Sequence, residues 1–105
     1  MRKILATAFV LLSFMASAQA ATTKDIPYGT DRKQRLDVYG ASKPCPSTGC
    51  PVLVYVHGGG WRNGSKSMGI SSTLGEVWGK AGAVVVSLDY RLTPDVVHPA
   101  HVQDI

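Results

Sequence analysis

Two stretches of the chain are apolar at nearly every position and rich in β-branched residues. They cover residues 52–56, Val-Leu-Val-Tyr-Val, and residues 83–88, Ala-Val-Val-Val-Ser-Leu. Continuous apolar runs of this length are typical of strands that are buried on both faces, as in a parallel sheet covered by helices. We therefore predict two such strands.

The segment between these strands, residues 71–81, predicts a helix. Ser71 or Ser72 is expected to cap its N-terminus, and Gly82 is placed to end it. Two glycines inside the segment weaken the helical pattern but would allow close packing on the sheet. The apolar residues that share one face, at the i, i+3, i+4 spacing, are Leu74, Val77 and Trp78. Strand, helix and strand together predict a right-handed βαβ unit.

Shorter elements flank this unit. Residues 26–28 and 36–39 predict two short strands joined by a turn at residues 29–31. In the second strand Leu36 and Val38 alternate with polar or amphipathic neighbours, which is typical of a half-buried strand near a sheet edge. Residues 99–105 predict the start of a helix, because Pro99 suits a first turn. The fold class is therefore α/β.

The first 20 residues have the pattern of a cleaved signal peptide. Met1-Arg2-Lys3 is a short positive start, residues 4–14 are almost all apolar, and Ala18-Gln19-Ala20 has the small residues that a signal peptidase accepts. A membrane anchor would need about 20 apolar residues. We expect cleavage after Ala20, a mature domain of residues 21–105 without a membrane span, and a secreted or periplasmic location.

The two cysteines suit an oxidising compartment. Cys45 and Cys50 lie in a loop with several prolines and a glycine, and a disulfide between them would close that loop. Two unpaired thiols are the alternative. A metal site is disfavoured, because no further cysteine or nearby histidine completes a ligand set.

Composition and charge narrow the function classes. The 105 residues are 45% hydrophobic and 17% charged, which argues against disorder. The formal charge of +4 falls to +2 without Arg2 and Lys3, and no basic run occurs. We therefore expect no nucleic-acid partner. Nothing in the sequence indicates a cofactor.

The segment His57-Gly58-Gly59-Gly60-Trp61 directly follows the first apolar strand. Consecutive glycines let backbone N–H groups approach a ligand closely, and ligands of open α/β sheets bind at the carboxyl ends of strands. Such a loop can stabilise the oxyanion of an acyl-transfer intermediate or can cradle a phosphate. A glycine-rich turn without a ligand is the third alternative.

The spacing of the residues disfavours the phosphate alternative. A P-loop needs a glycine, four residues and then Gly-Lys-Ser/Thr. Gly59 and Gly64 have the required gap, but Ser65 occupies the lysine position and Lys66 comes one residue late.

Residues 57–61 resemble the HGGG motif of α/β-hydrolase esterases and lipases, in the feruloyl/acetyl-xylan esterase-like and kynurenine formamidase-like branch. Three further segments resemble motifs of that family in the same order, over most of residues 25–104. They are Leu-Asp-Val-Tyr at 36–39, Ser-Leu-Asp-Tyr-Arg-Leu-Thr-Pro at 87–94, and His-Pro-Ala at 98–100 followed by Asp104. The resemblance implies the N-terminal portion of an α/β-hydrolase fold, with a mostly parallel sheet and flanking helices.

The resemblance also implies roles. Gly59 and Gly60 match the glycines whose N–H groups form the oxyanion hole, and His57 matches a histidine that holds the loop without acting as the base. The residues that it assigns to the support of the loop are His57, Gly58, Trp61, Asp89 and Arg91. From the residues alone, Asp89 and Arg91 could equally form a surface ion pair. Trp61 could line an acyl pocket or cap the core.

The catalytic triad of such hydrolases is not found in the 105 residues. The nucleophile should lie in G-x-S-x-G between a strand and a helix. The nearest segment, residues 69–73, has Thr73 in place of the last glycine and begins a helix. His98 and His101 precede any nucleophile and are expected to be solvated. The chain thus stops before the nucleophile strand, and we expect it alone to fold poorly, with residues 52–56 at an open edge, and to hydrolyse no ester.

The leading hypothesis is an exported carboxylic-ester hydrolase that acts through a serine nucleophile, with a small-molecule acyl ester as substrate. Of that enzyme the chain supplies the oxyanion hole. The alternatives are a non-catalytic exported binding protein, which could use an open strand edge, and a non-functional truncated product.

Overall fold

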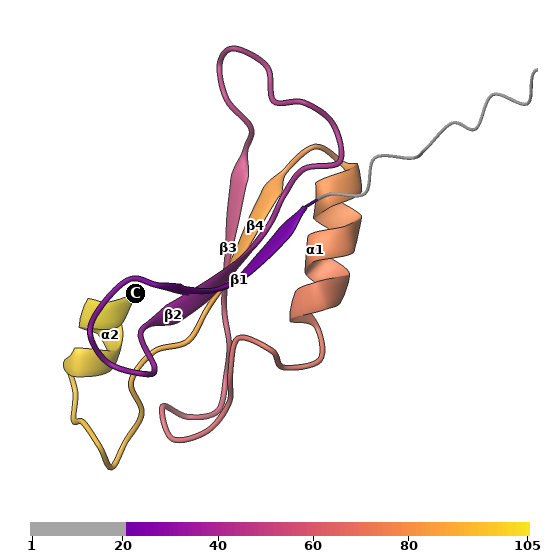
Figure 1. Ribbon diagram of the computed structural model, residues 1–105. Coiled ribbons are helices and arrows are strands. Elements are labelled where there is room, and N and C mark those ends of the chain that lie inside the picture. The colour runs from indigo at the N-terminus through magenta and orange to yellow at the C-terminus, as the bar shows by residue number, and fades with distance from the viewer. Residues whose placement is uncertain (1–20) are drawn as a thin grey trace, which may run out of the picture.

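The computed structural model describes residues 21–105, in which four strands form one mixed sheet (Figure 1). The spatial order is β1-β2-β4-β3, with β3 parallel to β4 and the other neighbours antiparallel. The strands are β1 (Thr22–Pro27), β2 (Arg35–Tyr39), β3 (Val52–Val56) and β4 (Val84–Leu88). The predicted signal peptide lies outside the described residues. No helix within residues 21–105 is long and apolar enough to cross a membrane.

The predicted strand–helix–strand unit is present. Helix α1 (Ser71–Lys80) connects the parallel strands β3 and β4. It ends in a Schellman motif, in which Gly82 has a φ of 94° and the N–H of Ala83 donates to the carbonyl of Trp78 at 2.9 Å. A short helix, α2 (Ala100–Asp104), follows Pro99 as predicted and lies beside the turn between β1 and β2 (Figure 1).

The helix packs on the sheet through its small residues and not through its apolar stripe. Its buried residues are Ser71, Gly75 and Gly79, whereas Val77 and Trp78 are 57% and 46% exposed. The face formed by Leu74, Val77 and Trp78 is therefore not the one that packs closely on the sheet, whereas the prediction that the two glycines allow close packing is confirmed. The glycines allow the helix axis to come close to β2, because a side chain at Gly75 would overlap the ring of Tyr39.

The predicted serine cap is also wrong. Ile70 occupies the N-cap position without a side-chain hydrogen bond, and Ser71 is buried within the first turn. A tight turn leads directly into the helix, with the N–H of Ser71 bonded to the carbonyl of Met68 at 3.0 Å. No serine oxygen is needed to begin it.

Strand β2 buries the face that its sequence marks as polar. Asp37 and Tyr39 are 0% and 8% exposed and lie under α1, while Leu36 and Val38 are only half-buried. The prediction of a half-buried strand near a sheet edge is confirmed, but the side chains that it buries are Asp37 and Tyr39. β2 lies between β1 and β4, and its polar face is the one that the helix covers.

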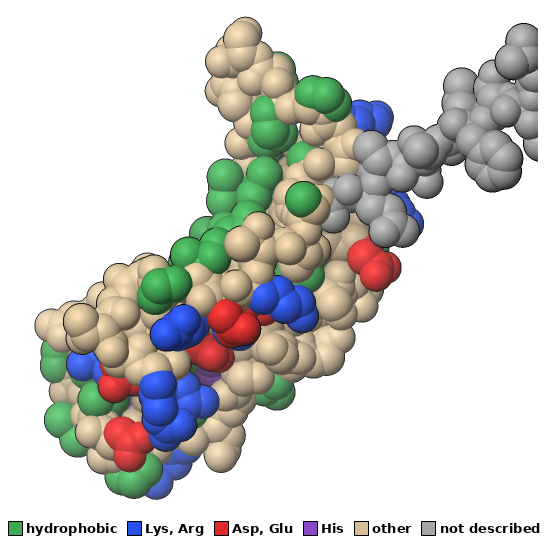
Figure 2. Space-filling model, in the orientation of Figure 1, with side chains coloured by type: hydrophobic (Ala, Val, Ile, Leu, Met, Phe, Trp, Pro, Cys, Tyr) green, Lys and Arg blue, Asp and Glu red, His purple; other side chains and the backbone are tan. Residues whose placement is uncertain are grey.

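Strand β3 is an edge strand, as expected for residues 52–56. The prediction that it is buried on both faces is wrong. It pairs with β4 only, and α1 lies on one face of the sheet (Figure 1). Val52, Val54 and Val56 consequently remain 62%, 52% and 37% exposed on the opposite face. Figure 2 shows hydrophobic side chains gathered along the part of the molecule where β3 lies in Figure 1.

The loop before β3 carries a disulfide. Cys45 and Cys50 are bonded, with a Cα–Cα distance of 5.0 Å. The loop projects beyond the sheet (Figure 1), and its base is held to α1 because the Ser42 hydroxyl donates to the carbonyl of Gly79 at 3.0 Å.

Substitution of Gly75 by alanine tests the glycine face of α1. Alanine favours a helix by about 1 kcal/mol over glycine, but overpacking against Tyr39 costs about 1–3 kcal/mol. We expect Gly75→Ala to lower the free energy of unfolding, measured with urea. The control is Gly69→Ala, at a position with open space around it, which should change that free energy by less than about 0.5 kcal/mol. A Gly75→Ala protein as stable as the control would contradict this packing.

Candidate functional site

The glycine loop leaves the C-terminal end of β3 and turns sharply. Gly59, Gly60 and Trp61 have φ values of 127°, 61° and 63°. The carbonyl of Gly59 accepts the N–H of Asn63 at 3.1 Å, and a β-carbon on Gly59 would collide with the backbone of Asn63. Glycine is therefore required at position 59 by both its φ and the close approach.

Two neighbouring backbone donors of this loop are unengaged. No hydrogen bond within residues 21–105 uses the N–H of Gly59 or Gly60, and both residues are exposed. The donors stand beyond the carboxyl end of a parallel strand, where open α/β sheets bind ligands. Adjacent N–H groups in such a place can stabilise a negative oxygen.

His57 holds the start of the loop from inside. Its side chain is buried, its Nδ1 lies 2.7 Å from the carbonyl oxygen of Gly58, and its ring stacks on Tyr90 at 4.3 Å. Because a carbonyl oxygen can only accept, Nδ1 carries the proton. Tyr90 in turn donates its hydroxyl to the carbonyl of His57 at 2.8 Å. Nε2 is buried and finds no partner within residues 21–105.

Trp61 lies over the same aromatic group. Its ring meets Tyr90 edge-on at 5.3 Å and lies 5.6 Å from His101, while 44% of the residue stays exposed. The prediction that His101 is solvated is wrong, because it is 3% exposed and its Nε2 lies 2.9 Å from the Thr93 hydroxyl. His98 is exposed, as expected. Trp61 therefore joins the loop to Tyr90 and to α2.

Asp89 and Arg91 do not form an ion pair with each other. Asp89 accepts the N–H of Lys66 at 2.7 Å, and its carbonyl accepts the Tyr28 hydroxyl. Burial and the nearby carboxylates of Asp104 and Asp89 raise the pKa of Tyr28 to about 12. The two residues thus contact different parts of the site, and the interpretation as a surface pair is wrong.

Arg91 pairs with Asp104 instead. Its Nη2 lies 2.7 Å from Oδ1 and its Nε 2.9 Å from Oδ2, in a two-pronged contact. The backbone N–H of Arg91 and the amide of Gln34 also donate to this carboxylate, whose side chain is 1% exposed. These bonds, with the Arg91 guanidinium foremost, lower the pKa of Asp104 to about 2. The pair joins α2 to the segment after β4 and to the β1–β2 turn.

Lys66 was not predicted to take part in the site. Its ammonium lies 2.8 Å from Asp25 and 2.9 Å from Asp37, and the residue is 7% exposed. An ammonium engaged by two carboxylates does not face a phosphate, which agrees with the failed P-loop register. Asp37 binds Lys66 and Asp104 binds Arg91, in two separate contacts, and only their place in the family motifs marked these two carboxylates in the sequence.

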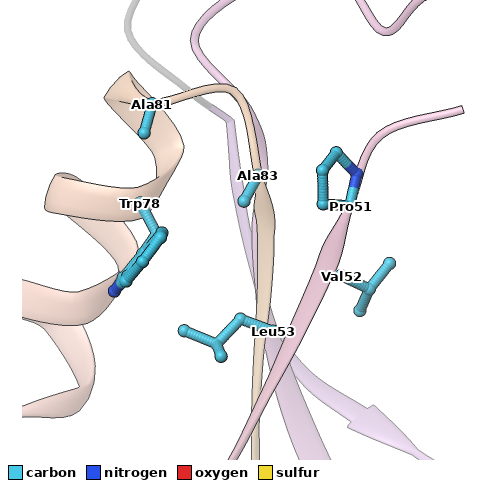
Figure 3. Close-up of a pocket in the computed structure, with 6 residues that line it drawn as sticks. All are labelled: Pro51, Val52, Leu53, Trp78, Ala81 and Ala83. Atoms are coloured by element: carbon cyan, nitrogen blue, oxygen red, sulfur yellow. The ribbon is translucent and has the colours of Figure 1, made fainter.

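Other chemistry is sparse within residues 21–105. No group of three or more His, Cys, Asp or Glu side chains there could hold a metal ion, and no hydrogen bond there joins a serine to a histidine. Ser71 and Ser72 lie in the first turn of α1. An apolar hollow of about 230 Å³ between Trp78 and Leu53 (Figure 3) lies where β3 and β4 begin, at the opposite end of the sheet from the glycine loop.

Solved esterases have a similar fold over this region. A truncated carbohydrate esterase from gut microbiota superposes with a TM-score of 0.69 at 22% identity, over 85% of this chain and 31% of that one. An inhibited esterase B from Lactobacillus rhamnosis superposes with a TM-score of 0.66 at 25% identity, over 82% of this chain and 28% of that one. The fold is that of the N-terminal portion of an α/β-hydrolase.

Sequence relatives agree with the fold. Esterase LipC of Mycobacterium tuberculosis is 37% identical over 78 residues, which cover 74% of this chain and 19% of LipC. Kynurenine formamidase of Danio rerio is 37% identical over 79 residues, 75% of this chain and 26% of that enzyme. A BD-FAE family profile matches residues 36–105, and the chain belongs to this family of HGGG-type α/β-hydrolases. It spans less than a third of the length of these relatives.

Alanine substitutions in the glycine loop test its backbone geometry. Gly59→Ala and Gly64→Ala place a β-carbon at positive φ and against backbone atoms, so each should cost more than about 2 kcal/mol of unfolding free energy. Gly60→Ala has a positive φ but open space, and should cost about 1 kcal/mol. Gly58→Ala meets neither constraint and serves as the control. Equal losses at all four positions, in urea unfolding, would contradict the described loop.

The Asp104 carboxylate predicts a loss of stability in acid. Its pKa is lowered to about 2 from 3.8, so its contribution is fully present above pH 3.8 and is lost as the pH falls towards 2. The difference in pKa corresponds to about 2 kcal/mol. Asp104→Asn should therefore be less stable than the wild type at pH 6, with the gap closing near pH 2. Asp95→Asn, at an exposed carboxylate, is the control; a gap independent of pH would contradict the prediction.

Proposed function

We propose that residues 57–61 form the oxyanion hole of an exported carboxylic-ester hydrolase. The observation that carries the proposal is the pair of unengaged N–H groups at Gly59 and Gly60, exposed at the end of β3 and held from below by buried His57. Donors fixed before the reaction stabilise the oxyanion of a tetrahedral intermediate without reorganisation. Membership of the BD-FAE family and the esterase relatives support this chemistry.

The reaction would proceed through an acyl-serine intermediate. A serine nucleophile, a histidine base and an acid act together in this chemistry, and the present chain would contribute the oxyanion hole. Residues 1–105 alone would then hydrolyse no ester. A carboxylic ester is the favoured substrate class, and the formamidase relatives add an acyl amide as an alternative, since both pass through the same kind of intermediate.

Export is the second part of the proposal. The signal-like pattern at residues 1–20 supports it, and so does the bond between Cys45 and Cys50, because disulfides persist in oxidising compartments. Detection of the protein in a periplasmic or culture-medium fraction with Ala21 as its first residue would test it.

The test of activity uses the whole reading frame that contains these 105 residues, including any codons that follow Ile105. The product is assayed with p-nitrophenyl butyrate and with N-formylkynurenine. Gly60→Ala distorts one donor position and should lower kcat about 10- to 100-fold with little change in KM, since oxyanion donors act in the transition state. Gly69→Ala, away from the loop, is the control. A product that hydrolyses neither compound would overturn the enzymatic function and favour a non-catalytic binding protein.

A further inference from the structure

The glycine loop ends at a buried charge that the proposed hydrolysis does not use. Lys66 is only 7% exposed. Lysine is almost never buried unless its charge is paired. Its ammonium donates to Asp25 on β1 at 2.8 Å and to Asp37 on β2 at 2.9 Å. Neither carboxylate belongs to the loop, so the charge connects the loop to two strands.

The backbone of Lys66 is fixed as firmly as its side chain. Its N–H donates to the carboxylate of Asp89 at 2.7 Å, and its carbonyl accepts the hydroxyl of Ser87, which is fully buried, at 2.8 Å. Ser87 lies on β4 and Asp89 directly follows it. One residue therefore engages β1, β2 and the end of β4 through all of its polar groups.

The N–H donors of Gly59 and Gly60 stand between two such attachments. His57, stacked on Tyr90, holds the loop where it leaves β3, and Lys66 holds it where it returns to the sheet. Between them, the N–H groups of Arg62 and Asn63 both bond to Gly59 within the loop itself, and the carbonyl of Trp61 accepts the N–H of Thr93 at 2.8 Å. The position of the donors relative to the sheet thus depends on the two ends of the loop together with this bond at Trp61.

Strand β1 is shaped to complete this ion cluster. Its pairing with β2 shifts register between Thr23 and Ile26, and Asp25 in this bulge has a φ of 59°. A positive φ is unfavourable at a residue other than glycine. In return the N–H of Asp25 bonds to Asp37 at 2.9 Å and its carboxylate reaches Lys66.

The cluster favours a charged Lys66. Burial alone would lower the pKa of Lys66, but its hydrogen bonds to Asp25 and Asp37 outweigh burial and raise it. The same hydrogen bond lowers the pKa of Asp25. Without the ammonium, the fully buried Asp37 would be left as an unpaired charge, which is strongly unfavourable.

We propose that Lys66 is a positioning residue of the glycine loop, and that its ion cluster with Asp25 and Asp37 sets where the N–H groups of Gly59 and Gly60 stand. The consequence for catalysis rests on the proposed function: loss of the cluster lowers kcat and leaves KM nearly unchanged, because displaced donors fail in the transition state. The consequence for the loop does not rest on it.

Trp61 provides a readout of the loop that needs no activity. Residues 1–105 contain two tryptophans, Trp61 in the loop and Trp78 on α1. In a protein of these 105 residues, Trp78→Phe leaves Trp61 as the reporter of the loop, and Trp61→Phe leaves Trp78 as the reporter of the helix. Quenching by acrylamide measures the exposure of each ring.

Lys66→Met removes the charge and keeps an unbranched side chain. In the Trp78→Phe background it should raise the quenching constant of Trp61, now 44% exposed, about two-fold as the loop opens. Lys66→Arg keeps the charge, and its increase in the Trp61 quenching constant should be at most half of the increase in Lys66→Met. Lys80→Met, on the exposed end of α1, is the matched control and should change nothing. In the Trp61→Phe background, Lys66→Met should leave Trp78 unchanged.

Asp25→Asn is a second variant that tests the proposal if the Lys66→Met protein does not fold. Its side chain is 67% exposed, so the substitution leaves the core intact, and it should raise Trp61 quenching by less than Lys66→Met. No change at Trp61 in Asp25→Asn and Lys66→Met, or equal changes at Trp61 and Trp78, would overturn the positioning role. In the whole reading-frame product, kcat and KM of Lys66→Met are measured with p-nitrophenyl butyrate. If the wild type hydrolyses no ester, the proposed function fails, while Trp61 quenching still decides the role of Lys66.

Discussion

A carboxylate with no access to water needs a positive charge beside it, and the arrangement of this site follows from that need at Asp37. The side chain lies under α1 at 0% exposure, and Lys66 is the cation that reaches it. To bring Lys66 there, the segment after the glycines must fold back onto the sheet, and β1 must bulge to add Asp25. Half of the four largest fully buried side chains, Asp37 and Ser87, are polar, so this small core is specified by hydrogen bonds as much as by apolar contact.

The sequence predicted the order of elements and the place of the glycine loop well, because both depend on local signals. Unbroken apolar runs, Gly82 after a helix and a glycine run after a strand are each recognisable within a few residues. Which face of each strand or helix is buried was harder to predict. Alternation in β2 distinguishes two sides but does not say which one the helix covers, and Asp37 on the covered side inverts the usual expectation. The helix packs through Gly75 and Gly79, which carry no apolar signal.

The ion-pair partners of Arg91 and Lys66 were still harder to predict. Arg91 has an acidic residue two positions before it and another thirteen positions after it, and the sequence gives no reason to prefer the distant one. The choice of Asp104 depends on α2 turning back against the β1–β2 turn, a tertiary arrangement. Lys66 is similar, since its two carboxylates come from strands that are far from it in the chain. Only the motif resemblance marked Asp37 and Asp104, and the BD-FAE match over residues 36–105 agrees with it, whereas nothing in the sequence marked Asp25.

The two ends of β3 carry different chemical groups. Both cysteines of the chain lie just before the strand begins, and the glycine loop lies just after it ends. A five-residue strand at about 3.3 Å per residue separates them by roughly 17 Å. A reducing agent followed by a maleimide would thus attach a dye or a surface linker at the far end of the sheet. The natural cysteines already provide an immobilisation handle that leaves the loop of Gly59 and Gly60 facing free solution.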